Sequence, residues 1–306
     1  MPVLDCGKKR KRPSYLQKDF SELQIVDIGE YGSPDGELDF NPSVYFTVQL
    51  ILVTSDGSLT GCTGILVDAS TVITTGGCLF NEQAFGGIGG TGFAESIFVF
   101  PGYDERIDEE VLLEYNYTIA ESIDVATAFV DDGDLEFNIG VIHLARPIGG
   151  LVAELETGGQ NYMGYDSQSN GRFRTRDHRN DGYPIGEDFQ AATQYTREGR
   201  FDDIDSDVVS IDSPSPFGMQ GSPAYTPTSG DNTVAYAMLS NASASGGTDF
   251  VRFTSDKVDF FDDFRDDNTP DVSDVQPIVD VLNFIPDQVD PGEALGNDDD
   301  LYVVSA

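Results

Sequence analysis

Short apolar runs, separated by Gly, Pro, Asn and Asp, divide most of the chain from about residue 44 onward. Their length, spacing and content of Val, Ile, Thr and Phe are typical of short β-strands. The predicted strands cover Val44–Thr54, Thr63–Val67, Thr71–Thr75, Ser96–Phe100, Val111–Asn116, Ile139–Leu144, Gln190–Thr196, Val208–Ile211, Ser222–Thr226, Val234–Leu239 and Phe250–Phe253. Many short strands at this spacing predict an all-β sandwich or a pair of β-barrels.

Helical periodicity is scarce. A short helix is predicted near residues 255–264, where Ser255 could cap it and Val258, Phe261 and Phe264 share one face. A second candidate covers residues 273–284, with Pro277 in its first turns. The stretch Gly164–Asp188, rich in Arg, Asn, Asp and Gly, is interpreted as a long loop.

The remaining segments are less regular. Residues 1–40 are polar and are interpreted as an N-terminal arm, and residues 265–306 as an acidic C-terminal extension. No apolar run approaches the 18 residues of a membrane-spanning helix, so membrane insertion is not expected. No internal repeat is visible.

The net charge of the chain bears on the environment in which the protein works. The 306 residues include 17 Lys and Arg against 54 Asp and Glu, a net charge of −37. Residues 1–12 hold five basic residues, Lys8 to Arg12, and one acidic residue; without them 12 basic and 53 acidic residues remain, a net charge of −41. Such a body repels nucleic acid and anionic membranes. It fits either an ordinary acidic marine or secreted protein or one from a high-salt environment.

The N-terminus carries no recognisable signal peptide, because the basic run at 8–12 follows Met1 without an apolar segment. This run is either a solvated tail or a nuclear-localisation or nucleic-acid-binding arm. A chain of this kind stays inside, leaves by another route or belongs to a virus particle.

Three separated segments of the chain form one recognisable constellation. They are Gly61-Cys-Thr-Gly-Ile-Leu-Val-Asp-Ala-Ser-Thr-Val-Ile-Thr-Thr-Gly-Gly-Cys78, Asn138-Ile-Gly-Val-Ile-His-Leu-Ala-Arg-Pro-Ile148 and Gly218-Met-Gln-Gly-Ser-Pro-Ala-Tyr225. In order and spacing they resemble the motifs of trypsin-like (chymotrypsin-fold) serine proteases, closest in pattern to bacterial glutamyl endopeptidases. Residues 235–240 and 251–264 resemble the family's groove-lining strand and its C-terminal strand and helix.

The resemblance implies a fold and a disulfide. It implies two six-stranded antiparallel Greek-key β-barrels, an N-barrel over about 41–150 and a C-barrel over about 151–254, followed by a helix at 255–264. It also implies that Cys62 pairs with Cys78, which leaves Cys6 over.

The same resemblance places Gly77, Asn138 and Gln220 where the family has its catalytic His, Asp and Ser. Glycine supplies no base, asparagine supplies no negative charge to steady an imidazolium, and an amide is not a nucleophile. We therefore expect a catalytically inactive homologue, a pseudoprotease, with no cofactor. The turn Gly218–Gly221 could still keep the shape of an oxyanion hole.

Other residues offer little to replace the triad. His143 is expected on the opposite face of its strand from Asn138, half-packed or exposed. His178 is expected to be solvated in a charged loop, and Ser222 to be structural. The cluster Arg172, Arg174, Arg176 and Arg179 could meet an acidic partner or pair internally with nearby carboxylates.

Two further motifs carry weak signals. Residues 87–92 fit G-x-G-x-x-G without the βαβ context that it needs. Asp203, Asp205 and Asp207 open like an EF-hand loop, but Val208 and Pro214 stand where Gly and Glu are required. Acidic loops there or at 298–300 could bind a cation incidentally, and no Cys/His cluster supports a zinc site.

The leading hypothesis is a non-catalytic homologue that acts as a binding, structural or assembly protein at a cell surface, in a virion or outside the cell. The alternatives are an active hydrolase with a relocated nucleophile and a regulatory decoy that partners a genuine protease. The partner's identity does not follow from the sequence.

Overall fold

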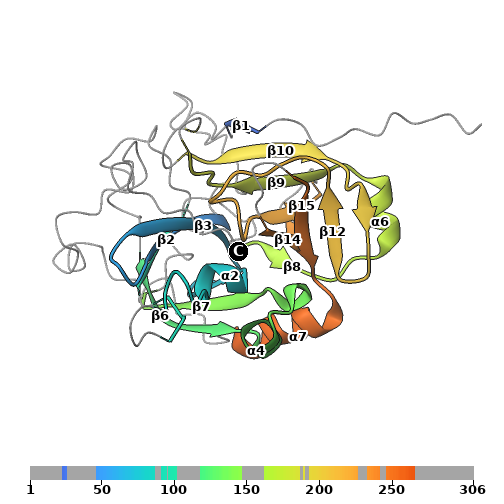
Figure 1. The fold of residues 1–306 in the computed structure, drawn as a ribbon. Helices are drawn as coiled ribbons and strands as arrows, with labels where there is room; N and C mark the ends of the chain where they lie inside the picture. The colour runs from blue at the N-terminus through green and yellow to red at the C-terminus, as the bar shows by residue number, and fades with distance from the viewer. Residues whose placement is uncertain are drawn as a thin grey trace, which may run out of the picture.

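The computed structural model describes residues 23–25, 46–86, 91–94, 96–101, 118–146, 162–186, 189, 193–226, 233–241 and 246–265. Two β-sheets dominate this part of the chain and lie side by side, the first in blue to green and the second in yellow to orange (Figure 1). The all-β prediction is confirmed.

The first sheet is a closed barrel of six antiparallel strands in the order β2-β3-β4-β7-β6-β5. Its strands are β2 (Thr47–Val53), β3 (Leu59–Leu66), β4 (Thr71–Thr74), β5 (Ile97–Pro101), β6 (Thr118–Val125) and β7 (Gly140–Leu144). Closure leaves this sheet without a free edge.

The second sheet has nine strands rather than the expected six. Its path is β1-β10-β9-β13-β14-β15-β12-β11, and β8 pairs in parallel with β14. The strands are β1 (Gln24–Ile25), β8 (Gly164–Tyr165), β9 (His178–Gly182), β10 (Tyr195–Gly199), β11 (Asp203–Ile204), β12 (Val208–Ile211), β13 (Pro223–Tyr225), β14 (Val234–Asn241) and β15 (Thr248–Arg252). Strand β1 lies within the predicted N-terminal arm and pairs with β10.

Strands β4 and β7 of the first barrel bury side chains on both of their faces. Along β7, Ile142 and Leu144 belong to the core inside the barrel, whereas Val141 belongs to the core shared with the second sheet. Val72 and Ile73 of β4 divide in the same way. Successive side chains of a strand point to opposite faces, so continuous apolar runs here serve two cores at once.

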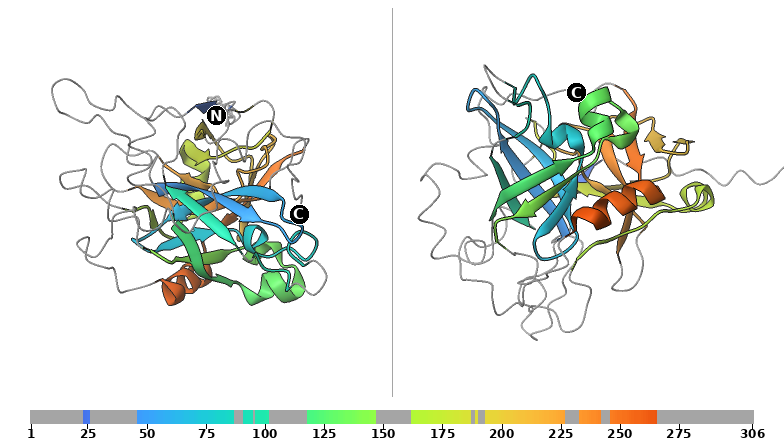
Figure 2. Two further views of the ribbon diagram at one scale, coloured as in Figure 1. Left: turned by 90° about the vertical axis from the view of Figure 1, so that its left-hand side faces the viewer. Right: turned by 90° about the horizontal axis from the view of Figure 1, so that it is seen from below.

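Five short helical segments accompany the sheets in the described part of the chain. They are α2 (Gly76–Leu79), α4 (Thr127–Asp132), the 3-10 turn η1 (Leu135–Phe137), α6 (Asn170–Thr175) and α7 (Ser255–Phe264). Seen from below, α7 lies beside strands of both sheets (Figure 2). Its Phe261 is buried against Phe253, with ring centroids 5.2 Å apart, and its buried Lys257 donates to Asp207 at 3.0 Å.

Helix α7 has the predicted bounds, but its N-cap residue is Thr254 rather than Ser255, and that cap makes no side-chain hydrogen bond. The stretch predicted as a loop, 164–188, instead contains β8, α6 and β9. Strand β6 was not predicted because Glu121, Ser122 and Asp124 break its apolar pattern. The candidate strand at 111–116, the candidate helix at 273–284, most of the arm and the extension beyond Arg265 lie outside the described residues.

Candidate functional site

The first motif forms β3, β4 and the one-turn helix α2. The Cys62 and Cys78 sulfurs are bonded, with a Cα–Cα distance of 6.2 Å, so the expected disulfide is confirmed. It ties α2 to the middle of β3, and both half-cystines are buried. This link holds Gly77 close to the first barrel wall.

The second motif places Asn138 directly against Gly77. Asn138 follows η1, is 2% exposed, and accepts a hydrogen bond on Oδ1 from the Gly77 backbone N–H at 2.7 Å. Its Nδ2 donates to Ser240 Oγ at 2.9 Å and to the Ser240 carbonyl oxygen at 3.3 Å. The amide therefore bridges the first barrel and β14 of the second sheet, with its acceptor and donor both used.

The third motif forms a turn that is fixed to both sheets. Gly218 and Gly221 adopt φ values of +84° and +86°, a region that favours glycine. The carbonyl oxygen of Gln220 accepts from the Thr63 N–H at 2.8 Å, and the Gly221 N–H donates to Leu239 at 2.8 Å. Gln220 is almost wholly buried, and its carbonyl oxygen lies 3.8 Å from Cys78 Sγ, next to Gly77.

The structure thus gathers Gly77, Asn138 and Gln220 at the junction of the two sheets. The backbone and the neighbours of Gly77 leave space for a Cβ at this position. Its φ is not positive, and a Cβ there would lie 3.6 Å from Asn138 Oδ1 and 3.8 Å from Phe129, which are ordinary van der Waals distances.

Neither histidine lies among these positions. His143 in β7 is half-buried, as predicted, and its Nε2 lies 2.9 Å from Asp124 Oδ2. Its register partners are Thr71 on β4 and Ser122 on β6, both in the first barrel.

His178 is not the solvated loop residue that the sequence predicted. It lies in β9, is 0% exposed, and packs among the rings of Phe173, Phe201 and Tyr236. Its Nδ1 bonds to the Tyr236 hydroxyl and its Nε2 lies 3.0 Å from the Phe173 carbonyl oxygen. Burial lowers its pKa to about 4, so the ring is neutral at physiological pH.

Polar residues that the sequence analysis did not single out fill the second core. Asn180 donates to Ser222 Oγ at 2.7 Å, which makes the buried Ser222 structural, as predicted. Asn180 also accepts from Arg197 Nε at 3.2 Å, and Arg197 donates further to Pro214 and to Ser215. Burial lowers the pKa of Arg197 to about 10. No local pattern in the sequence indicates this network, because its members come from distant segments.

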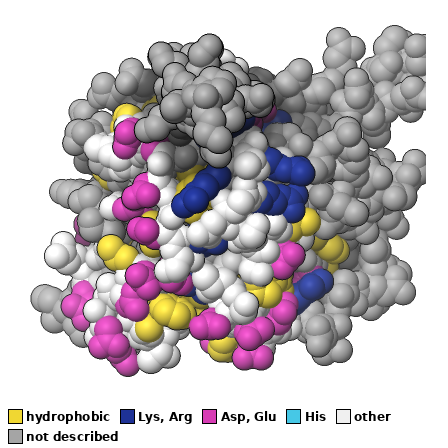
Figure 3. All heavy atoms as spheres, turned by 90° about the vertical axis from the view of Figure 1, so that its right-hand side faces the viewer, with side chains coloured by type: hydrophobic (Ala, Val, Ile, Leu, Met, Phe, Trp, Pro, Cys, Tyr) yellow, Lys and Arg dark blue, Asp and Glu magenta, His cyan; other side chains and the backbone are white. Residues whose placement is uncertain are grey.

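The four arginines of the predicted patch differ in their burial and in their partners. Arg179 is held by Asp181 at 2.8 Å, and this pairing raises its pKa against the effect of burial. Arg174 and Arg176 are exposed at the end of α6, and Arg172 is half-buried and donates to Gln168. Figure 3 shows the side of the molecule that lies at the right of Figure 1, where α6 is found. Lys and Arg side chains gather on this face, with Asp and Glu along its left and lower margins.

The structure adds no evidence for the other candidate sites. Among the residues described, no group of three or more His, Cys, Asp or Glu side chains is arranged to hold a metal ion. Asp207, from the sequence resembling an EF-hand, pairs with Lys257 instead. Residues 87–90 of the glycine-rich motif lie outside the described part. No helix within the described ranges is long and apolar enough to cross a membrane.

A closed barrel, a second curled sheet and a junction that carries the three motifs define the chymotrypsin-like fold. Solved serine proteases share it. A Glu endopeptidase matches at 18% identity and TM-score 0.55, over 71% of this chain and 89% of that one. The thermostable serine protease AL20 from an extremophilic microorganism matches at 17% identity and TM-score 0.56, over 74% of this chain and 100% of that one. The protease Anisep from Arthrobacter nicotinovorans matches at 18% identity and TM-score 0.50, over 70% of this chain and 91% of that one.

At these identities the likeness is one of fold. A comparison with protein-family models finds no match, and neither does a sequence comparison with curated proteins.

Proposed function

We propose that this chain is a catalytically inactive protein of chymotrypsin-like fold that acts by binding a protein partner. The observation that carries the proposal is the contact of Asn138 with Gly77, where hydrolysis by this fold needs a carboxylate that orients an imidazole. The chain has two histidines, and both are engaged elsewhere, His143 with Asp124 and His178 with Tyr236 and Phe173. A hydroxyl nucleophile without such a base stays weak.

The exposed arginines at the end of α6 are the proposed partner contact. Arg174 and Arg176 form no ion pair within the described residues, and they stand on a protein whose net charge is −37. A short acidic segment of a partner could meet them, whereas an extended polyanion would also meet the acidic surroundings. The Cys62–Cys78 disulfide supports an oxidising location such as the cell exterior or a surface assembly.

Catalysis is tested with a fluorophosphonate probe and with casein hydrolysis on the purified protein. We expect neither labelling nor turnover. A label mapped to this chain, together with turnover that the same probe abolishes, would overturn the proposal. The matched variant carries Gly77→His, Asn138→Asp and Gln220→Ser; we expect it to fold and to show at most faint activity, because catalytic side chains need a supporting shell of neighbours.

Binding is tested by recovery of partners from the native source with the wild type and with Arg174→Ala/Arg176→Ala. The control, Gln83→Glu/Thr127→Glu, changes two exposed residues elsewhere and shifts the net charge equally, by −2. A partner lost with the arginine variant and kept with the control supports the contact. Equal recovery with both variants contradicts it.

A further inference from the structure

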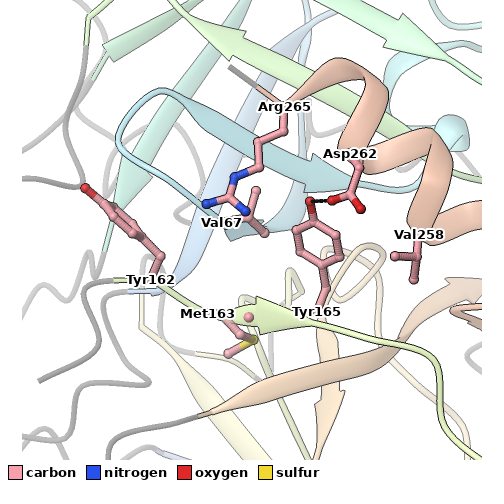
Figure 4. Close-up of a pocket in the computed structure, with 8 residues that line it drawn as sticks. Val67, Tyr162, Met163, Tyr165, Val258, Asp262 and Arg265 are labelled. Atoms are coloured by element: carbon pink, nitrogen blue, oxygen red, sulfur yellow. Dashed lines mark hydrogen bonds between the residues drawn. The ribbon is translucent and has the colours of Figure 1, made fainter. Parts of the chain in front are cut away.

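A cavity of about 380 Å³ lies beside α7, and its lining does not include Gly77, Asn138 or Gln220. Its lining combines apolar, aromatic and charged side chains: Val67, Tyr162, Met163, Tyr165, Val258, Asp262 and Arg265, together with the backbone of Gly164 (Figure 4). Small-molecule sites fall between about 300 and 1,000 Å³ and have mostly apolar walls with a few polar groups. Its volume lies in this range, but polar and apolar atoms share its walls about equally.

A buried carboxylate, Asp68, follows the lining residue Val67 in sequence and pairs with the lining residue Arg265. Asp68 is 1% exposed, and its Oδ1 accepts from the Ser70 N–H at 2.8 Å. Its Oδ2 has no hydrogen-bond partner among the described residues, although Arg265 Nε, on the cavity lining, lies 3.4 Å away. A buried charged oxygen that lacks a hydrogen bond is costly, so this oxygen favours a cationic donor.

The cavity walls also suit a cation. The guanidinium of Arg265 lies between Tyr162 and Tyr165, and the Tyr165 hydroxyl donates to Asp262 at 2.6 Å (Figure 4). Burial and the charge of Asp68 raise the pKa of Tyr162 to about 12, with Arg265 opposing the rise. The guanidinium of Arg265 therefore lies near one carboxylate, Asp68, and two tyrosines, and aromatic faces attract cations.

Arg265 is a replaceable occupant. It is the residue after the last turn of α7, has an extended backbone, and its side chain remains 41% exposed. Its partner Asp68 is buried, so loss of this pair without a substitute would leave an uncompensated buried charge. Arg265 can therefore turn toward solvent when another cation takes its place beside Asp68.

We propose that this cavity binds an organic cation, an ammonium or guanidinium group on a short apolar body, which replaces Arg265 between Tyr162 and Tyr165 and donates to Asp68. The apolar body rests on Val67, Met163 and Val258. The net charge of −37 raises the local concentration of cations and repels anionic ligands of the same size. The ligand is either a free organic ammonium compound or the basic side chain of a peptide.

The test is calorimetric or NMR titration of the full chain with two probes, tetramethylammonium and N-acetyl-arginine methylamide, at constant ionic strength. We expect saturable binding by the wild type. Arg265→Gln removes the competing guanidinium, so affinity should rise several-fold. Asp68→Asn removes the acceptor charge, so affinity should fall at least tenfold. The control is Asp259→Asn, which removes one exposed charge from α7 outside the cavity and should leave affinity unchanged.

The outcomes are separable. Tighter binding of the arginine probe assigns the site to a basic side chain, and tighter binding of tetramethylammonium assigns it to a free ammonium compound. No binding by either wild type or Arg265→Gln overturns the proposal, and this result does not depend on whether Asp68→Asn folds. Equal weakening by Asp68→Asn and Asp259→Asn also overturns it, because binding would then follow net charge alone.

Discussion

The backbone N–H of Gly77 donates to the side-chain oxygen of Asn138 at 2.7 Å, and the same side chain donates to Ser240 on the other sheet. The contact joins residues 61 positions apart and spans the junction of the two halves of the fold. An amide suits this place because it offers an acceptor to one side and donors to the other. A carboxylate would offer only acceptors.

Asn138→Asp should destabilise the protein by about 1–3 kcal/mol, because a buried carboxylate oxygen would then face the carbonyl oxygen of Ser240. Urea unfolding at pH 7 measures the change. The matched control is Asn138→Asp in a Ser240→Ala background, which separates the loss of the hydroxyl contact from the new charge. Unchanged stability of Asn138→Asp would show that this amide is not a structural requirement.

Gly77→Ala and Gly221→Ala form a matched pair with opposite expectations. A Cβ at Gly77 has ordinary contacts, so that variant should stay within about 0.5 kcal/mol of the wild type. A Cβ at Gly221 would overlap the Thr63 carbonyl oxygen at a φ of +86°, so its loss of stability should exceed about 2 kcal/mol. Thermal melting of both variants decides. Similar melting temperatures would contradict the packing of this turn.

Removal of the disulfide should also destabilise the chain. Cys62 and Cys78 close a loop of 16 residues, and the chain-entropy account gives about 3 kcal/mol for such a loop. The double variant Cys62→Ala/Cys78→Ala is compared with the wild type by denaturant unfolding under oxidising conditions. The wild type in reductant should approach the variant. A variant as stable as the oxidised wild type would show that the bond is dispensable.

His178 should make stability fall in mild acid. Its pKa is about 4 in the folded chain against 6.5 unfolded, so the unfolded state binds the extra proton first. The stability that the folded chain gains from a neutral His178 ring is fully present above pH 6.5. It is lost as pH falls through 4, by about 3 kcal/mol in total. His178→Gln should lack this part of the pH slope between 6.5 and 4. Parallel profiles of unfolding free energy against pH for the wild type and His178→Gln would contradict this prediction.

Stability should rise with ionic strength, because salt screens repulsion within a chain of net charge −37. Melting temperatures between low and molar NaCl measure the effect, and sucrose of equal osmolality serves as the uncharged control. A melting temperature that stays flat or falls with NaCl would remove the high-salt hypothesis. It would leave the proposal of an inactive site untouched.

Much of the fold was predictable because its strands bury apolar side chains at regular intervals. The runs at 47–53, 71–74 and 140–144 were recognised for this reason, whereas β6 and β9 were not. Strand β9 reads His-Arg-Asn-Asp-Gly, yet four of its five residues are buried. Its polar groups are satisfied by Ser222, Tyr225 and Tyr236, which follow it by more than 40 residues.

The all-β class, the cysteine pair, the helix at 255–264 and the meeting of three motifs could be predicted without coordinates, since each depends on local periodicity or on spacing that a known family shares. The burial of His178, the contact of Ser240 with Asn138, the room for a Cβ at Gly77 and the pairing of Asp68 with Arg265 became visible only in the folded chain. A polar side chain can be buried wherever a hydrogen-bond partner reaches it, and such partners come from distant segments that only folding brings together.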